Sequence, residues 1–90
     1  MRLVSARDLG LYVRQRRQDL GRSQADLASM AGVSRRWLTA MEAGKSTAEI
    51  GLILRTLAAL GVIIDVQVIE RPPGQVDLDE LLAELGRDDG

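Results

Sequence analysis

Two adjacent arginines, Arg35 and Arg36, are the side chains of this 90-residue chain best suited to binding chemistry. They stand at the start of a short predicted helix, and Thr39 and Ala40 follow one turn later. A planar guanidinium group can hydrogen-bond O6 and N7 of a guanine together, which is worth about 1–3 kcal/mol of discrimination between bases. Because cations are disfavoured near a helix N-terminus, two of them there favour a compensating anion, and the alternative is a solvated helix start.

The composition argues against an enzyme. The chain has no His and no Cys, which excludes thiol nucleophiles, disulfides, imidazole bases and the usual zinc sites. Its longest apolar runs are far shorter than the roughly 20 residues that span a bilayer, and no secretory signal stands at its start. We therefore expect a cytoplasmic, nucleoid-associated protein with no enzymatic activity, no cofactor, no metal and no membrane partner.

The charge is divided between the two halves of the chain. Residues 1–45 carry nine basic and four acidic side chains, a net charge of +5, whereas residues 46–90 carry three basic and nine acidic ones, a net charge of −6. This division favours a polyanion-binding surface in the first half and a different partner for the second half. The alternative is that solvated faces happen to segregate.

Capping residues, glycines and apolar side chains at helical spacing predict four helices in residues 1–61. A serine three residues ahead of an aspartate is a capping pattern, and it occurs at Ser5 and at Ser23. Glycines stand where the helices should end. The predicted helices run from after Ser5 to Gly21, over 24–30, over 35–43 with Ser34 as cap, and from a cap at Ser46 or Thr47 to Leu60.

The second and third predicted helices, with a tight turn at Gly32 between them, form a helix-turn-helix. The small Ala28 allows the two helices to approach, and Val33 and Leu38 fill the angle between them. The outer face of the third helix is then polar and short enough to enter a DNA major groove, which is about 12 Å wide.

After Gly61 the pattern changes to that of a strand, which we place at 62–71 and which Pro72 and Pro73 end. The chain offers no second strand, and an unpaired strand leaves its backbone hydrogen-bonding groups unsatisfied. We therefore expect pairing with the same strand of a second copy about a two-fold axis, or with a partner protein. The alternative is irregular packing on its own domain. The residues of the dimer strand would be Val62, Ile63, Ile64, Val66 and Val68.

The remaining stretch, 72–90, is acidic, and we predict a partly ordered tail. Apolar residues at helical spacing allow a short amphipathic helix there, capped by Asp77 with Glu80. The domain organisation expected from the sequence is thus a helix-turn-helix domain at 1–61, a dimerisation strand at 62–71 and a tail at 72–90.

The run from Ser23 through Gly32, Val33 and Ser34 to Leu38, Glu42, Gly44 and Lys45 resembles the Cro/cI-type (XRE) helix-turn-helix family, over about residues 5–61. The resemblance implies an all-α, lambda-repressor-like bundle of four to five helices, here with the short C-terminal strand pairing across a homodimer. It also implies a structural ion pair between Arg17 and Glu42.

The same resemblance implies which residues contact double-stranded DNA. The positions matching Arg35, Arg36, Thr39 and Ala40 would face bases or the adjacent phosphates, and we assign them to base reading. Ala40 departs from longer polar side chains in many relatives, which leaves it a thymine-methyl contact. Trp37 stands where smaller or Tyr-like residues are usual, and it would offer its indole N–H to a phosphate or pack in the core. The candidates for backbone contacts are Gln24, Arg14, Arg22, Ser34, Trp37 and Lys45.

A helix-turn-helix domain followed by a single strand is similar to the HipB-type antitoxins. That resemblance implies a homodimer that represses its own operon at an inverted repeat and binds a HipA-like Ser/Thr kinase toxin. A tail aromatic, which would support the known docking mode, is lacking after Trp37. The alternatives are a stand-alone XRE-family regulator and a protein-interaction module that does not bind DNA.

Overall fold

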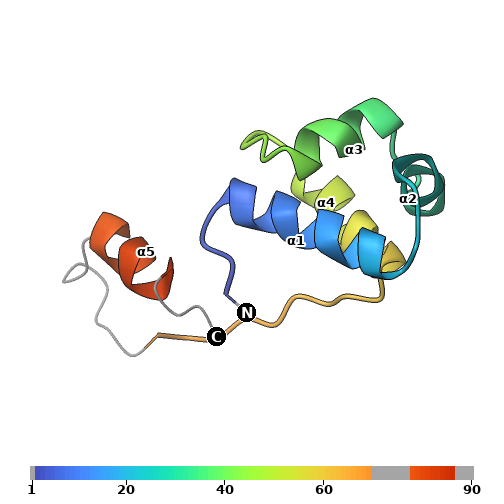
Figure 1. Cartoon of the computed structure of the whole chain (residues 1–90). Coiled ribbons are helices and arrows are strands. Elements are labelled where there is room, and N and C mark those ends of the chain that lie inside the picture. Colours follow the sequence, from blue (N-terminus) through green and yellow to red (C-terminus); the bar gives the residue numbers. More distant parts are fainter. Residues whose placement is uncertain (1, 70–77, 87–90) are drawn as a thin grey trace.

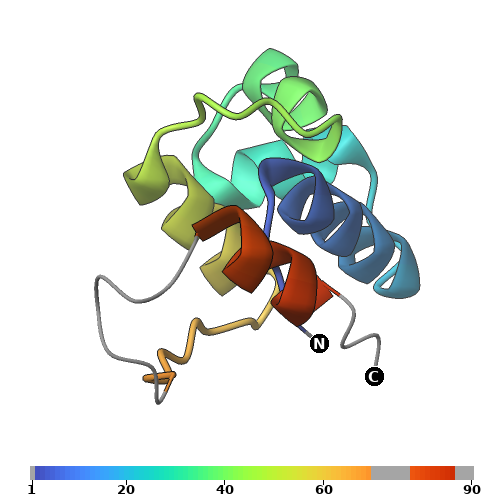
Figure 2. The ribbon, with the colours of Figure 1, turned by 90° about the vertical axis from the view of Figure 1, so that its left-hand side faces the viewer.

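The computed structural model describes residues 2–69 and 78–86, and within them the chain is all-helical. The helices are α1 (Ala6–Asp19), α2 (Gln24–Ala31), α3 (Arg35–Glu42), α4 (Ile50–Ala59) and α5 (Leu78–Gly86). Figures 1 and 2 show α1 to α4 gathered into one bundle, which residues 62–69 leave as an extended trace on the side of α1 away from α3.

Local capping chemistry sets the starts of the first three helices. The hydroxyls of Ser5, Ser23 and Ser34 accept hydrogen bonds from backbone N–H groups three residues later, at 3.0–3.1 Å. At Ser23 the capping box is complete, because the Asp26 carboxylate accepts from the Ser23 backbone N–H at 3.2 Å. These three helix starts are confirmed, and the observed ends lie within two residues of those predicted.

The predicted start of the fourth helix is wrong. Its N-cap is Glu49, whose side chain makes no capping hydrogen bond, rather than Ser46 or Thr47. Ser46 and Thr47 lie in a turn, and the next residue, Ala48, packs against the hydrophobic core. The chain therefore turns back toward the core before it can begin a helix.

The core fills the space between the four bundle helices. Leu27 and Leu38, which the sequence places on the inner faces of the helix-turn-helix, are fully buried, together with Val13 of α1. Each such side chain removed from water contributes roughly 1.5–3 kcal/mol. The other buried hydrophobic residues are Ala28, Ala31, Met41, Ile53, Leu57 and Leu60.

Gly10 lets α1 cross α3 at close range, a constraint that the sequence analysis missed. A Cβ at this position would lie 2.5 Å from the Met41 carbonyl oxygen and 2.6 Å from that of Glu42. Both neighbours are backbone atoms of α3, so they cannot swing aside as a flexible side chain would. The approach of the two helices therefore requires glycine at position 10.

Three arginines satisfy carbonyl groups at helix C-termini. Arg16 donates from Nε to the Leu60 carbonyl at 3.1 Å, and Arg22 donates from Nη1 to the Ala59 carbonyl at 2.8 Å. Arg55 of α4 donates to the carbonyls of Ala31 and Gly32 at the end of α2. The last carbonyls of a helix lack partners within it and carry partial negative charge, so a cation stabilises them.

Residues 63–69 are exposed to different degrees after they leave the bundle. Val62 is half-buried against the core, but Ile63, Val66 and Val68 are 89, 84 and 91 % exposed. Ile64 and Ile69 are 52 and 45 % exposed, so irregular packing of this segment on its own domain stays an open alternative. The described residues contain no strand, because the single chain offers no ladder partner. Pairing across a dimer stays a prediction, and residues 70–71 of the expected strand lie outside the described residues.

The tail forms a helix where it is described. α5 covers Leu78–Gly86, and Gly86 lies beside the N-terminal segment, since an added Cβ there would meet Val4 Cγ2 at 3.6 Å. The proposed cap residue Asp77 lies outside the described residues, as do the other residues of 72–77 and 87–90.

Gly10→Ala tests the close crossing of α1 and α3. The added methyl group must push two backbone carbonyls of α3 away from α1, and overpacking of this kind costs about 1–3 kcal/mol. Urea unfolding followed by the fluorescence of the single Trp gives the free energy of unfolding. Gly51→Ala of α4 is the matched control, because nothing lies within 4 Å of its Cβ position. Gly51 is the second residue of α4, so the change should stabilise by less than the roughly 0.5–1 kcal/mol of a helix interior. Equal stability of the two variants would contradict the packing argument.

Candidate nucleic-acid interface

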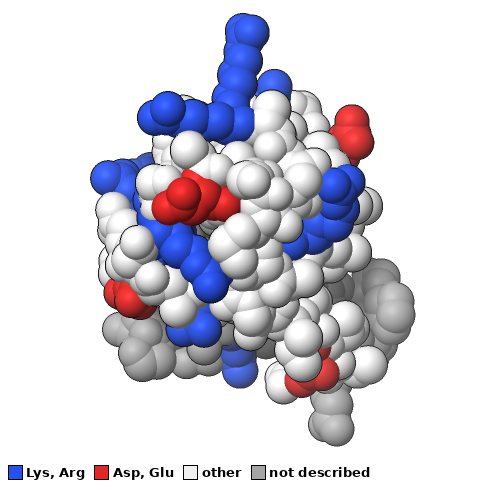
Figure 3. Space-filling model, turned by 90° about the vertical axis from the view of Figure 1, so that its right-hand side faces the viewer, with Lys and Arg blue, Asp and Glu red and all other residues white. Residues whose placement is uncertain are grey.

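The outer face of α3 carries the cationic side chains that the sequence singled out. Arg35, Arg36 and Thr39 are exposed, and Ala40 is half-buried beside them. The turn before α3 passes through Gly32 in the left-handed region, at φ 70°, and Val33 N–H donates to the Ala28 carbonyl at 3.0 Å. In Figure 3, Lys and Arg side chains gather at the top of the molecule, where α3 lies in Figure 1.

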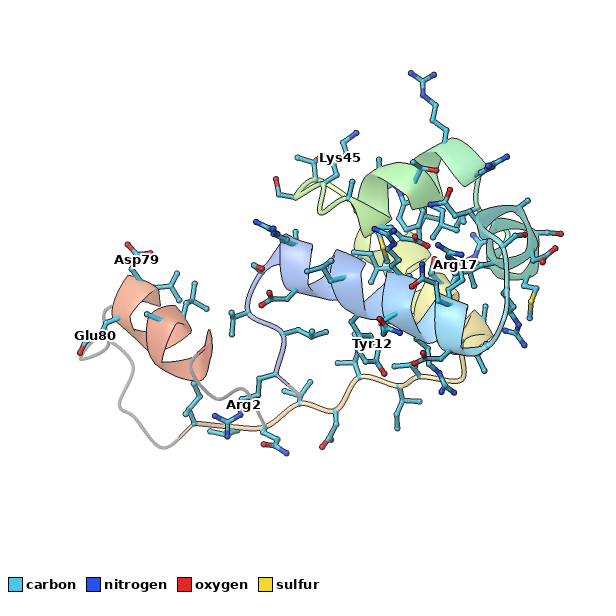
Figure 4. The ribbon with its side chains drawn as sticks, viewed as in Figure 1. Arg2, Tyr12, Arg17, Lys45, Asp79 and Glu80 are labelled. Atoms are coloured by element: carbon cyan, nitrogen blue, oxygen red, sulfur yellow. The ribbon has the colours of Figure 1, made fainter. Side chains whose placement is uncertain are left out.

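The orientation of α3 is fixed by an ion pair with α1. Arg17 donates from Nε and Nη2 to the two carboxylate oxygens of Glu42, at 2.8 and 3.0 Å. Glu42 is 7 % exposed, and the hydrogen bond that its carboxylate accepts from Arg17 raises the pKa of Arg17. Arg17 also donates from Nη1 to the Arg22 carbonyl at 2.8 Å. Figure 4 shows Arg17 inside the bundle between these elements.

Gln24 extends this pair to the exposed side of α3. Its amide nitrogen donates to Glu42 Oε1 at 3.2 Å, and its amide oxygen lies 3.0 Å from the Thr39 hydroxyl. The same hydroxyl lies 2.9 Å from the Arg35 carbonyl. A hydroxyl has one proton, so Thr39 can donate to only one of these two oxygens, and its lone pairs can still accept a hydrogen bond.

The residues around the end of α3 form a shallow hollow. It measures about 350 Å³, and Arg36, Trp37, Ala40, Lys45 and Glu49 are among the residues that line it. Trp37 is half-buried and packs against the core. Ser34 also borders the hollow, and Figure 4 shows Lys45 projecting at the far end of α3. The hollow therefore joins the cationic helix to the loop that follows it.

Two of the expected backbone contacts lie elsewhere. Arg22 is half-buried, with its guanidinium on the Ala59 carbonyl at the end of α4. Arg14 is exposed on α1, where it borders a shallow depression with Leu11, Tyr12 and Gln15. The structure therefore does not bring either guanidinium into the group formed by Arg35, Arg36 and Lys45.

Arg7 is a further basic residue beside this face, and the sequence analysis missed it. It is exposed near the start of α1, and the Cβ position of Gly44 lies 3.0 Å from its Cα. Arg7 thus stands next to the loop that carries Lys45. Only its positive charge marks it in the sequence, because the contact joins residues far apart in the chain.

The described part of the chain shows neither a metal site nor a membrane helix. Among residues 2–69 and 78–86, no three His, Cys, Asp or Glu side chains gather where they could hold a metal ion. No helix within those ranges has the length and apolar character needed to cross a bilayer.

Comparison with known proteins shows which family the chain belongs to. A family model described as a helix-turn-helix domain matches residues 8–68. A relative from Sinorhizobium fredii (strain NBRC 101917 / NGR234), described as the uncharacterized HTH-type transcriptional regulator y4mF, is 42 % identical over 65 residues. The match covers 72 % of this chain and 86 % of the relative. No solved structure matches.

Glu42→Ala tests the dependence of α3 on the ion pair. The change leaves the Arg17 guanidinium nearly buried without its anion, and breaking such a pair costs about 3–5 kcal/mol. We expect a matching loss in the free energy of unfolding measured in urea. Arg17→Lys keeps the charge but cannot form the forked contact, so its loss should be smaller.

Glu49→Ala serves as the matched control for the ion-pair experiment. It removes an exposed carboxylate that makes no capping hydrogen bond, and its stability should stay close to that of the unaltered protein. If Glu42→Ala were as stable as Glu49→Ala, the role given to the pair would be wrong.

Proposed function

Since this chain belongs to the helix-turn-helix domain family, we propose that it is a sequence-specific DNA-binding repressor of the XRE type. The observation that carries the proposal is the outer face of α3, where Arg35, Arg36 and Thr39 are exposed together on a helix held by a buried ion pair. A rigid cationic helix of eight residues suits the major groove, where base edges can be read directly.

The side chains divide into two roles in this proposal. Arg35 and Arg36 read bases through their guanidinium groups, and Thr39 offers an acceptor and a methyl group. Ala40 contributes at most an apolar contact to a thymine methyl. Phosphate contacts position the protein without reading sequence, and the residues suited to them are Lys45, Ser34, Gln24, Trp37 and, from α1, Arg7.

The repressor would act as a homodimer on an inverted repeat. The exposed, β-branched segment after α4 supports this, because its backbone has no ladder partner in the single chain. Two α3 helices about one helical turn apart, roughly 34–36 Å, would read half-sites of opposite direction.

We further propose that the protein is the antitoxin of a HipBA-type module. Its acidic C-terminal part is repelled by DNA, which leaves it available to a protein partner. α5 supports this proposal, because it opens with Asp79 and Glu80 and exposes Leu78. The partner would be a HipA-like Ser/Thr kinase, and its binding would raise operator affinity by favouring the dimer. The second candidate is a stand-alone regulator of the same family.

Arginine and lysine variants separate base reading from phosphate contacts. We expect Arg35→Ala and Arg36→Ala to lose about 1–3 kcal/mol at the preferred site and to relax base preference. Lys45→Ala should weaken all sequences alike and lower the salt slope by about one unit. The measurement is fluorescence anisotropy against a selected operator and its single-base variants, at several salt concentrations. Unchanged relative affinities in the Arg35 and Arg36 variants would contradict base reading.

Isolation of the native complex separates the antitoxin from the stand-alone regulator. A tagged full-length chain expressed from its own locus should co-purify with a kinase and with operator DNA. Deletion of residues 78–90 should abolish retention of the kinase while the remaining residues 1–77 still bind operator DNA. Recovery of operator DNA with no protein partner would favour the stand-alone regulator.

A further inference from the structure

The exposed segment from Ile63 to Ile69 reads nearly the same in both directions. Its sequence is Ile-Ile-Asp-Val-Gln-Val-Ile, with Val66 at the centre. When the segment is reversed, each β-branched residue falls on the position of another β-branched residue. The two polar residues, Asp65 and Gln67, change places with each other. The same seven residues are all exposed, whereas Val62 before them is half-buried. The near-palindrome therefore begins where the exposed stretch after Val62 begins.

Two-fold symmetry restricts how such a segment can pair with its own copy. In an antiparallel ladder, directly opposite residues lie on the same face of the sheet. A two-fold axis perpendicular to the ladder leaves each residue and its copy on the same face of the sheet. Because the face alternates along a strand, the sequence numbers of two opposite residues must differ by an even number. The axis must therefore pass between one residue and the same residue of the other copy.

Only one centre gives consistent partners along the segment. An axis at Asp65 sets two carboxylates opposite each other, which is destabilising. An axis at Ile64 sets Ile63 against Asp65, and an axis at Gln67 sets Asp65 against Ile69. An axis at Val66 pairs Asp65 with Gln67, Ile64 with Val68 and Ile63 with Ile69, so every pair is matched in polarity.

We propose that Ile63–Ile69 pairs antiparallel with the same residues of a second copy, in a register centred on Val66. This inference rests on the homodimer of the proposed function and specifies its interface. A parallel pair is disfavoured because it sets the two Asp65 carboxylates side by side. The occupant is a second copy rather than another protein, since the near-palindrome makes the segment complementary to itself.

The register also accounts for the exposure pattern. Side chains alternate between faces of a strand, so in a strand Ile64, Val66 and Val68 share the face of Val62, which is half-buried against the core. Ile64 is 52 % exposed while Val68 is 91 % exposed, so the single chain covers only the first part of that face. Pairing about Val66 brings the partner's Val68 beside Ile64 and thus into the covered region. Figure 4 shows Tyr12 pointing from α1 toward this trace.

A cysteine scan tests the register, because the chain has no cysteine of its own. Single variants of the full-length protein place Cys at Ile64, Asp65, Val66, Gln67 and Val68 and are oxidised with copper phenanthroline. Val66→Cys should cross-link to a dimer at least tenfold faster than the other four. In this register the two copies of residue 65, or of residue 67, are displaced from each other by about 6.6 Å along the strands. Together with the spacing between strands, this distance is beyond the reach of a disulfide. A mixture of Ile64→Cys and Val68→Cys should form a heterodimer.

Charge variants provide a second measurement of the register. In Gln67→Lys each new ammonium lies opposite the partner's Asp65, so the dimer dissociation constant from sedimentation should fall several-fold. Gln67→Asp, the matched control, should raise it. A weaker dimer in Gln67→Lys would overturn the register, since it would indicate that the two copies of residue 67 face each other.

The outcomes separate the register from the proposed function. A cross-linking maximum at position 64 or 67 overturns the Val66 register and leaves the homodimer standing. A monomer by sedimentation, with no cross-linking at any position, overturns both the register and the homodimer. The base-preference experiment on Arg35 and Arg36 decides DNA binding in either case, because the segment lies on the other side of the bundle from α3.

Discussion

The forked ion pair between Arg17 and Glu42 is the interaction on which the exposed face of α3 depends. A buried ion pair is not in itself strong evidence for stability, because taking both charges out of water costs much of what their attraction returns. Its value here is geometric, since two N–H groups of one planar guanidinium donate to the two carboxylate oxygens and so fix how the groups face each other. Gln24 and the Arg22 carbonyl occupy further positions around the same two groups. The angle between α1, α2 and α3 is thereby specified by polar contacts as well as by the core.

The charge of a sequence overstates the charge that a surface presents. The first 45 residues contain nine basic side chains, but Arg16, Arg17 and Arg22 are used within the fold on carbonyl and carboxylate groups. Such arginines neutralise helix ends that would otherwise leave carbonyls without partners. The cationic face is consequently built by fewer residues, gathered on α3 and on the loop after it.

Sequence predicted well those features that depend on neighbouring residues. The serine caps at Ser5, Ser23 and Ser34 act over three residues, so local patterns were enough to place the helix starts. The true start of α4 could not be found this way, because the position of Ala48 depends on the core. Gly10 was missed for the same reason, since its constraint comes from carbonyls of another helix. The guanidinium of Arg22 was assigned to DNA because nothing local indicates that it reaches the end of α4.

Two adjacent arginines on α1 connect the ends of the molecule that matter for a symmetric assembly. Arg17 holds α3, whereas Arg16 holds the Leu60 carbonyl, immediately before the chain leaves the bundle. If two copies pair after α4, the distance between their α3 helices is set by the contacts from the paired segment through Leu60 and α1 to α3. A flexible element anywhere in that path would let the spacing vary and blur discrimination between operators. Charge-assisted hydrogen bonds at both arginines are the contacts that keep this path rigid.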